Sequence, residues 1–163
     1  MSDFKLGNIT IPEELSLIPL KNTVLFPKVV APLILQRPKS VGALDSAMTK
    51  DRLVLFVTQR NTEDTVGRND LFTVGTVGRI VSVFKLPDGS SKIDVEGLVR
   101  ARITEFTSET PFFKVKVEPF PIVLRHNLEE KAFLRRAIEQ FKMVSEVRSF
   151  PTILPEIIYM MMQ

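Results

Sequence analysis

Short apolar runs separated by turn residues fill the first 120 residues of the chain. Many of the apolar residues are β-branched or aromatic, as is typical of strands. The first three runs are residues 17–20, 24–26 and 29–35, and each contains or borders a proline. Because proline lacks a backbone N–H, it suits a bend or the edge of a sheet. The pattern therefore predicts irregular opening strands.

A change to helical spacing follows. Val41, Leu44 and Met48 share one helical face, and Pro38 stands where a first helical turn tolerates proline. A short helix is predicted over residues 38–50. Beyond it, the continuous apolar run 53–57 has strand length, and the polar segment 61–70 is expected to be an exposed, mobile loop.

Residues 71–86 form a long β-branched run that contains Gly75 and Gly78. Glycine inside a strand usually marks a bulge or a barrel corner, so this strand is expected to bend. Turn residues 87–90 then lead into residues 93–99, where apolar and acidic positions alternate, which predicts a hairpin. The runs 101–106 and 112–117 continue the strand pattern. The predicted fold over residues 1–120 is mainly β, a bent-sheet pseudo-barrel that holds one short helix.

Residues 121–163 have helical spacing and form the second predicted domain. Asn127 and Glu130 have the spacing of a capping box, and the apolar positions that follow predict an amphipathic helix to about Ser149. Pro155 opens a second predicted helix. That helix ends in an apolar stretch without a capping residue, so we expect the natural gene to continue past Gln163.

Composition narrows the class of protein. There are 22 Lys and Arg against 19 Asp and Glu, a formal charge of +3, and the excess is not clustered in either domain. A nucleic-acid partner is therefore not expected. The chain has no cysteine, no secretion signal and no apolar run near the roughly 20 residues that span a bilayer. A cytoplasmic protein without a membrane partner is expected.

Catalytic and metal-binding patterns are missing from the sequence. The chain has a single histidine, His126, and no cysteine that could act as its nucleophile. No orienting partner for His126 is visible in the sequence, so it is interpreted as an exposed loop residue. Acidic residues occur only as scattered pairs. We expect no catalytic residue, no metal site and no cofactor in this chain.

Two groups of residues could bind an anion, but for each a structural role is the better explanation. Residues 75–78 read Gly-Thr-Val-Gly but lack the lysine and the following helix of a phosphate loop, so a strand bulge is favoured. Arg79, Arg100 and Arg102 could together bind an anion. Charged, outward-facing strand positions explain them more simply.

Four ordered blocks of sequence resemble the Lon protease N-terminal domain family. Residues 19–27 read Pro-Leu-Lys-Asn-Thr-Val-Leu-Phe-Pro, and blocks at 70–77, 86–89 and 95–103 follow in the family's order. The similarity covers about residues 15–163. One departure lies at residues 36–40, where Pro38 stands at a turn in which the family often has an acidic residue before the lysine.

The resemblance implies a PUA-like pseudo-barrel and a helical segment, which lead to an ATPase module and a Ser-Lys protease domain. It places ATP and Mg in that ATPase module. For this chain it implies a non-catalytic role, namely recognition of unfolded or degron-bearing polypeptides and help in assembling a homohexamer. The parent protease would degrade misfolded and short-lived regulatory proteins.

Two other functions remain open at this stage: a free-standing adaptor with a Lon-like domain, and a PUA-like RNA-binding module. A surface for unfolded polypeptides needs exposed apolar side chains with a polar rim. The candidates are five large apolar residues of the β region: Leu33, Leu35, Phe84, Phe112 and Phe113. For each of them, a place in the core is the competing interpretation.

Overall fold

Strands dominate the part of the chain that the structure describes. The computed structural model describes residues 3–121, 132–133, 135–140 and 143. In these residues the helix α1 (Pro38–Met48) and a helical stretch at 135–140 accompany the strands. The predicted mainly β fold with one short helix and a later helix is confirmed. The predicted capping box at Asn127 and the helix after Pro155 lie outside the described residues.

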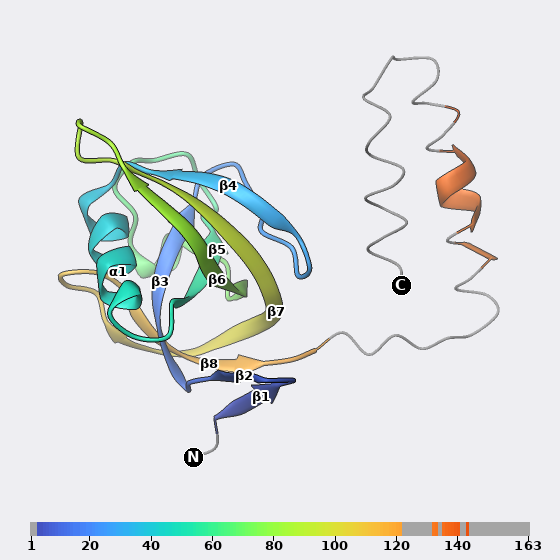
Figure 1. The fold of residues 1–163 in the computed structure, drawn as a ribbon, viewed down its shortest axis with the longest axis horizontal. Helices are drawn as coiled ribbons and strands as arrows, with labels where there is room; N and C mark the ends of the chain where they lie inside the picture. Colours follow the sequence, from blue (N-terminus) through green and yellow to red (C-terminus); the bar gives the residue numbers. More distant parts are fainter. Residues whose placement is uncertain (1–2, 122–131, 134, 141–142, 144–163) are drawn as a thin grey trace. The chain divides into compact units, whose positions relative to one another are not determined.

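Six strands form the main sheet, in the order β4-β7-β6-β5-β3-β8. All neighbours are antiparallel except β3 and β5, which are parallel. An additional pairing between β7 and β8 curls the sheet, so that β7, β6, β5, β3 and β8 form a ring and β4 lies outside it (Figure 1). The bounds are β3 Glu14–Leu20, β4 Val30–Leu35, β5 Leu53–Thr58, β6 Val74–Lys85, β7 Ser91–Ser108 and β8 Lys114–Pro119.

A separate two-stranded hairpin precedes the main sheet. Its strands are β1 (Phe4–Leu6) and β2 (Ile9–Ile11), and Gly7 between them has a φ of 58°. A positive φ at this turn suits glycine, which has no Cβ to clash with the backbone. These three-residue strands are too short to show a periodic pattern, so the sequence does not predict them.

The glycines of β6 mark a bend, as predicted. The register between β6 and β7 shifts between Val77 and Gly78 and again between Ile80 and Ser82. Gly78 lies against Phe56 of β5, whose ring atoms would be 2.9 Å from an added Cβ. The segment 75–78 is thus a bulged strand packed on its neighbour, and the phosphate-loop alternative has no support in this geometry.

The predicted hairpin joins β6 to β7. Leu86 donates its N–H to the carbonyl of Ser90, and the carboxylate of Asp88 accepts hydrogen bonds from both the N–H and the hydroxyl of Ser90. Gly89 has a φ of 83°, which closes the turn. Strand β7 then runs without a break through both predicted runs, 93–99 and 101–106.

Residues 24–26 are the exception among the predicted strands, because they lie in a loop. Asn22 and Lys28, on either side, have φ values of 55° and 65°, which interrupt an extended backbone. Separate backbone hydrogen bonds, rather than the regular bonds of a strand pair, hold the loop. Lys28 donates its N–H to the carbonyl of Gly97, and Gly97 donates to the carbonyl of Val29.

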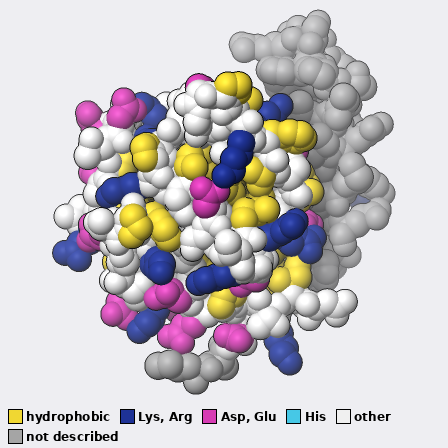
Figure 2. Space-filling view, turned by 60° about the vertical axis from the view of Figure 1, so that its left-hand side comes forward, with side chains coloured by type: hydrophobic (Ala, Val, Ile, Leu, Met, Phe, Trp, Pro, Cys, Tyr) yellow, Lys and Arg dark blue, Asp and Glu magenta, His cyan; other side chains and the backbone are white. Residues whose placement is uncertain are grey.

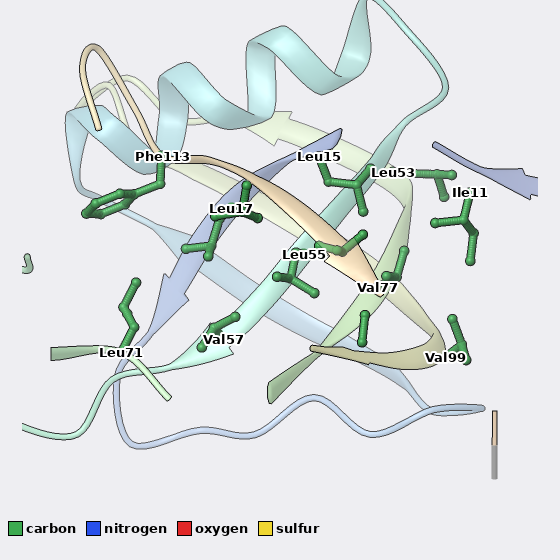
Figure 3. Close-up of a cluster of buried hydrophobic side chains, with 13 residues drawn as sticks. Ile11, Leu15, Leu17, Leu53, Leu55, Val57, Leu71, Val77, Val99 and Phe113 are labelled. Atoms are coloured by element: carbon green, nitrogen blue, oxygen red, sulfur yellow. The ribbon is translucent and has the colours of Figure 1, made fainter. Parts of the chain in front are cut away.

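Strand β5 is buried on both of its faces and divides the core into two clusters. Leu55 and Val57 belong to one cluster, together with Phe113 of the segment before β8 (Figure 3). Val54 and Phe56 point into the other cluster, which α1 covers. Burial on both faces explains why this strand is a continuous apolar run rather than an alternating one.

Two units divide the chain, Met1–Ile122 and Val123–Gln163. The first contains every strand named above. In the residues that the structure describes, none of the helices has the length and the hydropathy required to cross a membrane.

Candidate functional site

Exposed apolar residues meet beside the loop that joins β3 to β4. Val24 is 56% exposed, Phe72 is 44% exposed and Val74 is 37% exposed. These three residues line a shallow cavity of about 300 Å³, with Thr58 and Thr73 at its margin. The guanidinium of Arg60 lies 4.5 Å from the centre of the Phe72 ring. We call Val24, Phe72 and Val74 the apolar patch.

The loop that carries Val24 is held in place by its backbone carbonyls. Thr58 donates its hydroxyl to the carbonyl of Thr23 at 2.7 Å, and Thr76 donates to the carbonyl of Leu25 at 2.6 Å. Leu25 is buried, whereas Val24 and Phe26 on either side of it are exposed. The loop therefore presents Val24 to solvent from a fixed position.

A larger groove lies next to this loop. Its volume is about 930 Å³, and it is bordered by the end of β3, by β4, by the start of α1 and by residues 64–66. Its lining is mostly apolar and includes three prolines. The apolar lining residues are Pro19, Leu20, Pro32, Leu33, Ile34, Leu35, Pro38, Val66 and Phe113.

The structure brings three of the five candidate residues together at this groove. Leu33 is half-buried, and Leu35 and Phe113 are buried, with 4% and 2% of their surfaces exposed. Phe84 is 62% exposed and lies on β6, outside the groove lining. Phe112 is half-buried beneath the ammonium group of Lys114. Leu35 and Phe113 therefore form the floor of the groove and contribute little accessible surface.

The apolar patch was missed in the sequence. A signal was present, because the run 24–26 is followed by Pro27 and preceded by the turn formers Asn22 and Thr23. A short apolar run between turn residues does not pair with other strands along its length. Some of its side chains therefore remain uncovered by a sheet. This pattern indicates exposed side chains at Val24, which belongs to the apolar patch, and at Phe26, which lies outside it.

Basic side chains outnumber acidic ones in the groove lining. Lys21 pairs with Asp64 at 3.0 Å. Arg37 donates to the side-chain oxygen of Gln59 at 2.8 Å and to the backbone carbonyl of Glu63 at 3.3 Å. Lys39 donates to the carbonyl of Glu109 at 3.2 Å. Arg37 and Lys39 thus contact neutral acceptors, and their positive charges are not compensated by these contacts.

The hydrogen bond and the charge of Lys21 hold the pKa of Asp64 below its ordinary value, with a smaller contribution from the charge of Arg37. A lowered folded-state pKa stabilises the fold above the unfolded value of about 3.9. That stabilisation is lost as the pH falls through the folded-state pKa. The pair is exposed, so its contribution to stability is small.

We expect Lys21→Gln to raise the titration midpoint of Asp64 toward the ordinary aspartate value, because the substitution removes the positive charge and the ammonium group that donates the hydrogen bond. Carbon-13 NMR of the carboxyl group as a function of pH measures this midpoint. Lys85→Gln is the matched control, since Lys85 pairs with Asp45 at the same distance of 3.0 Å. An Asp64 midpoint that Lys21→Gln leaves unchanged would contradict the assignment.

The three arginines considered as an anion site have other contacts. Arg79 forms an ion pair with Glu96 of β7. Arg100 and Arg102 lie over the ring of Phe120, 5.5 and 5.9 Å from its centre. These contacts agree with charged, outward-facing strand positions. Figure 2 shows one face of the molecule, where Lys and Arg side chains lie at the surface among Asp and Glu side chains. Over the described part of the chain, no three His, Cys, Asp or Glu residues are grouped so that they could hold a metal ion.

Comparison with known proteins gives one consistent result. The family model for the substrate-binding domain of ATP-dependent protease La (LON) matches residues 14–162. The Lon protease of Trichlorobacter lovleyi is 39% identical over 142 residues, which are 85% of this chain and 17% of that protein. The Lon protease of Escherichia coli K12 is 40% identical over 79% of this chain and 17% of its own length. The chain thus spans about one sixth of these relatives.

Solved structures share the fold. The N-terminal domain of the Mycobacterium avium complex Lon protease aligns with a TM-score of 0.67 at 20% identity, over 83% of this chain and 69% of that one. The Lon N-terminal domain protein from Xanthomonas campestris aligns with a TM-score of 0.60 at 17% identity, over 80% and 73% of the two chains.

Proposed function

The chain belongs to the family of Lon protease substrate-binding domains, and we propose that it recognises unfolded or degron-bearing polypeptides for an ATP-dependent serine protease. In this proposal the chain is not catalytic. ATP and Mg bind to an ATPase module, and a separate protease domain cleaves the client. The clients are misfolded and short-lived regulatory proteins in the cytoplasm.

The observation that carries the proposal is the apolar patch. An unfolded client offers apolar side chains without a fixed geometry, so its receptor needs exposed apolar surface with polar groups around it. Val24, Phe72 and Val74 provide that surface, and Thr58, Thr73 and Arg60 surround it. The hydrogen bonds of the loop hold Val24 in place before a client arrives, which reduces the entropy lost on binding.

A single patch of this size supports weak binding. Association costs several kcal/mol in lost freedom of motion, so the expected dissociation constant of one copy is about micromolar or weaker. In a homohexamer, six copies would face the same long client. The effective concentration of binding sites would then raise the affinity without any new contact.

Val24→Asp should weaken the binding of an unfolded client about fivefold to tenfold, because a carboxylate in the patch must lose water when an apolar segment binds. The client is reduced, carboxymethylated α-lactalbumin with a fluorescent label, and binding is measured by anisotropy at constant salt. Val81→Asp is the matched control. It has the same side-chain change and 53% exposure against 56%, but it lies on β6 outside the patch.

Equal weakening by Val24→Asp and Val81→Asp would show that the added negative charge, and not the patch, controls binding. A steep loss of affinity with salt together with indifference to both variants would indicate a polyanionic partner. Either result would reject the proposed role of the patch.

A further inference from the structure

Strand β4 lies outside the ring that strands β7, β6, β5, β3 and β8 close. Among the described strands, β4 pairs only with β7, so its other edge has no partner. Strand β8 pairs with β3 only at Glu14–Ser16, which leaves the C-terminal half of β3 with β5 alone as a strand neighbour. The groove is lined by residues from both of these edges. An unpaired strand edge offers backbone N–H and C=O groups to another extended chain.

Pro32 identifies which backbone groups of β4 lie on its free edge. Antiparallel partners alternate between pairs that exchange two hydrogen bonds and pairs that exchange none. Pro32 faces Asp94 and has no N–H, so its pair is of the second kind. The N–H groups of Val30 and Ile34, two residues away on either side, therefore point away from β7. Within the described part of the chain, no residue outside the sheet accepts a hydrogen bond from these two amides, so they can bond a new strand.

The charge of the groove indicates what such a strand carries. Its lining has three basic side chains, Lys21, Arg37 and Lys39, but Asp64 as its one acidic side chain. Asp64 is paired with Lys21 and also lies within reach of the charge of Arg37, while the hydrogen bonds of Arg37 and Lys39 go to neutral oxygens. A carboxylate next to apolar side chains complements this combination of charge and apolar lining.

We propose that the groove binds an extended client segment as an added strand along the free edge of β4, with an Asp or Glu side chain of the segment held by Arg37 and Lys39. This proposal rests on the proposed function and assigns a second subsite to it, distinct from the apolar patch. Alternate side chains of the segment enter the groove toward Leu33, and the others remain outside beside Ile34. Backbone hydrogen bonds supply affinity that does not depend on the sequence of the segment. The carboxylate adds a preference for segments that contain Asp or Glu.

The first test uses peptides and the unaltered chain. The parent is an acetylated, amidated nonapeptide of alternating Val and Thr with a central Glu. Two further peptides carry N-methyl groups at either the odd or the even positions. Since only alternate amides of an added strand face β4, one N-methylated peptide should bind about tenfold more weakly and the other like the parent. On parent binding, the amides of Val30 and Ile34 should become protected from hydrogen exchange, as NMR measures.

The second test concerns the carboxylate. Lys39→Gln should weaken binding of the Glu peptide about twofold to fivefold and leave a Gln version of the peptide unaffected. Lys85→Gln is the control, because Lys85 is an exposed lysine on β6 outside the groove lining. If the Gln peptide binds as well as the Glu peptide, the assignment of a side-chain carboxylate is wrong.

Ile34→Pro provides a third test, with Ile34→Ala as its partner. Ile34 is 62% exposed, and proline there removes one outward N–H in the way that Pro32 already does. Proline should abolish protection of the β4 edge by the parent peptide, while alanine retains it. The peptide series keeps the proposal testable if the proline variant does not fold.

The outcomes separate the two proposals. Equal affinities of both N-methylated peptides, or no protection at Val30 and Ile34, would overturn strand addition, while sensitivity of the unfolded client to Val24→Asp would leave the proposed function intact. If neither the peptides nor the unfolded client bind to the chain, both proposals fail.

Discussion

Replacement of Phe56 by alanine should lower the free energy of unfolding by about 3–5 kcal/mol. Phe56 is 2% exposed, and it packs in the core cluster that α1 covers. Its ring also packs on Gly78 of β6, where an added Cβ would lie 2.9 Å from the nearest ring atom. The strand that carries it pairs with both β3 and β6, and relaxation around the cavity would disturb three strands.

Urea denaturation followed by circular dichroism measures this loss. Phe84→Ala is the matched control, because the same atoms are removed from a ring that is 62% exposed, and its expected cost is well below that of Phe56→Ala. Domains of this size have a free energy of unfolding of only about 5–15 kcal/mol, so Phe56→Ala should remove a large part of it. Similar losses for the two variants would contradict the assignment of Phe56 to the core.

Gly97→Ala should destabilise the chain by about 1–3 kcal/mol and should also displace the loop that carries the apolar patch. A Cβ at Gly97 would lie 2.1 Å from the carbonyl oxygen of Phe26 and 2.9 Å from its carbonyl carbon. Both are backbone atoms and cannot rotate away. The shift would also weaken the two hydrogen bonds that Gly97 makes with Lys28 and Val29.

Two measurements check this prediction. Thermal unfolding should show a lowered Tm, and hydrogen exchange should show faster exchange of the Lys28 amide, whose acceptor is the carbonyl of Gly97. Gly67→Ala is the control. The nearest atom to a Cβ at Gly67 is a side-chain oxygen of Asp70 at 3.5 Å, an ordinary contact. A Gly97→Ala variant as stable as Gly67→Ala would show that the loop does not pack closely on β7.

The link between Gly97 and the patch has a functional consequence. Gly97 lies in a block of sequence that carries the family resemblance, residues 95–103, and the loop lies in another, residues 19–27. In the fold these blocks touch, because the backbone of Phe26 rests on Gly97. Gly97→Ala should therefore also weaken the binding of an unfolded client, although Gly97 itself is buried.

The sequence by itself determined the class of the fold. Turn residues at 87–90 and the alternation after them were enough to predict the β6–β7 hairpin, since both are local signals. The helix α1 followed from its spacing and from Pro38, and the bulge in β6 followed from Gly78. The ordered blocks were specific enough to indicate the family.

Only the tertiary structure decided which apolar residues are accessible. Leu35 and Phe113 became buried, whereas Val24 and Phe72 stayed exposed, although all four are large apolar residues next to strand-like runs. Exposure depends on which strands pair across long distances in the sequence, and periodicity within one run carries no information about that pairing. The free edge of β4 arises in the same way, because the ring closes through β7 and β8 and leaves β4 outside the closure.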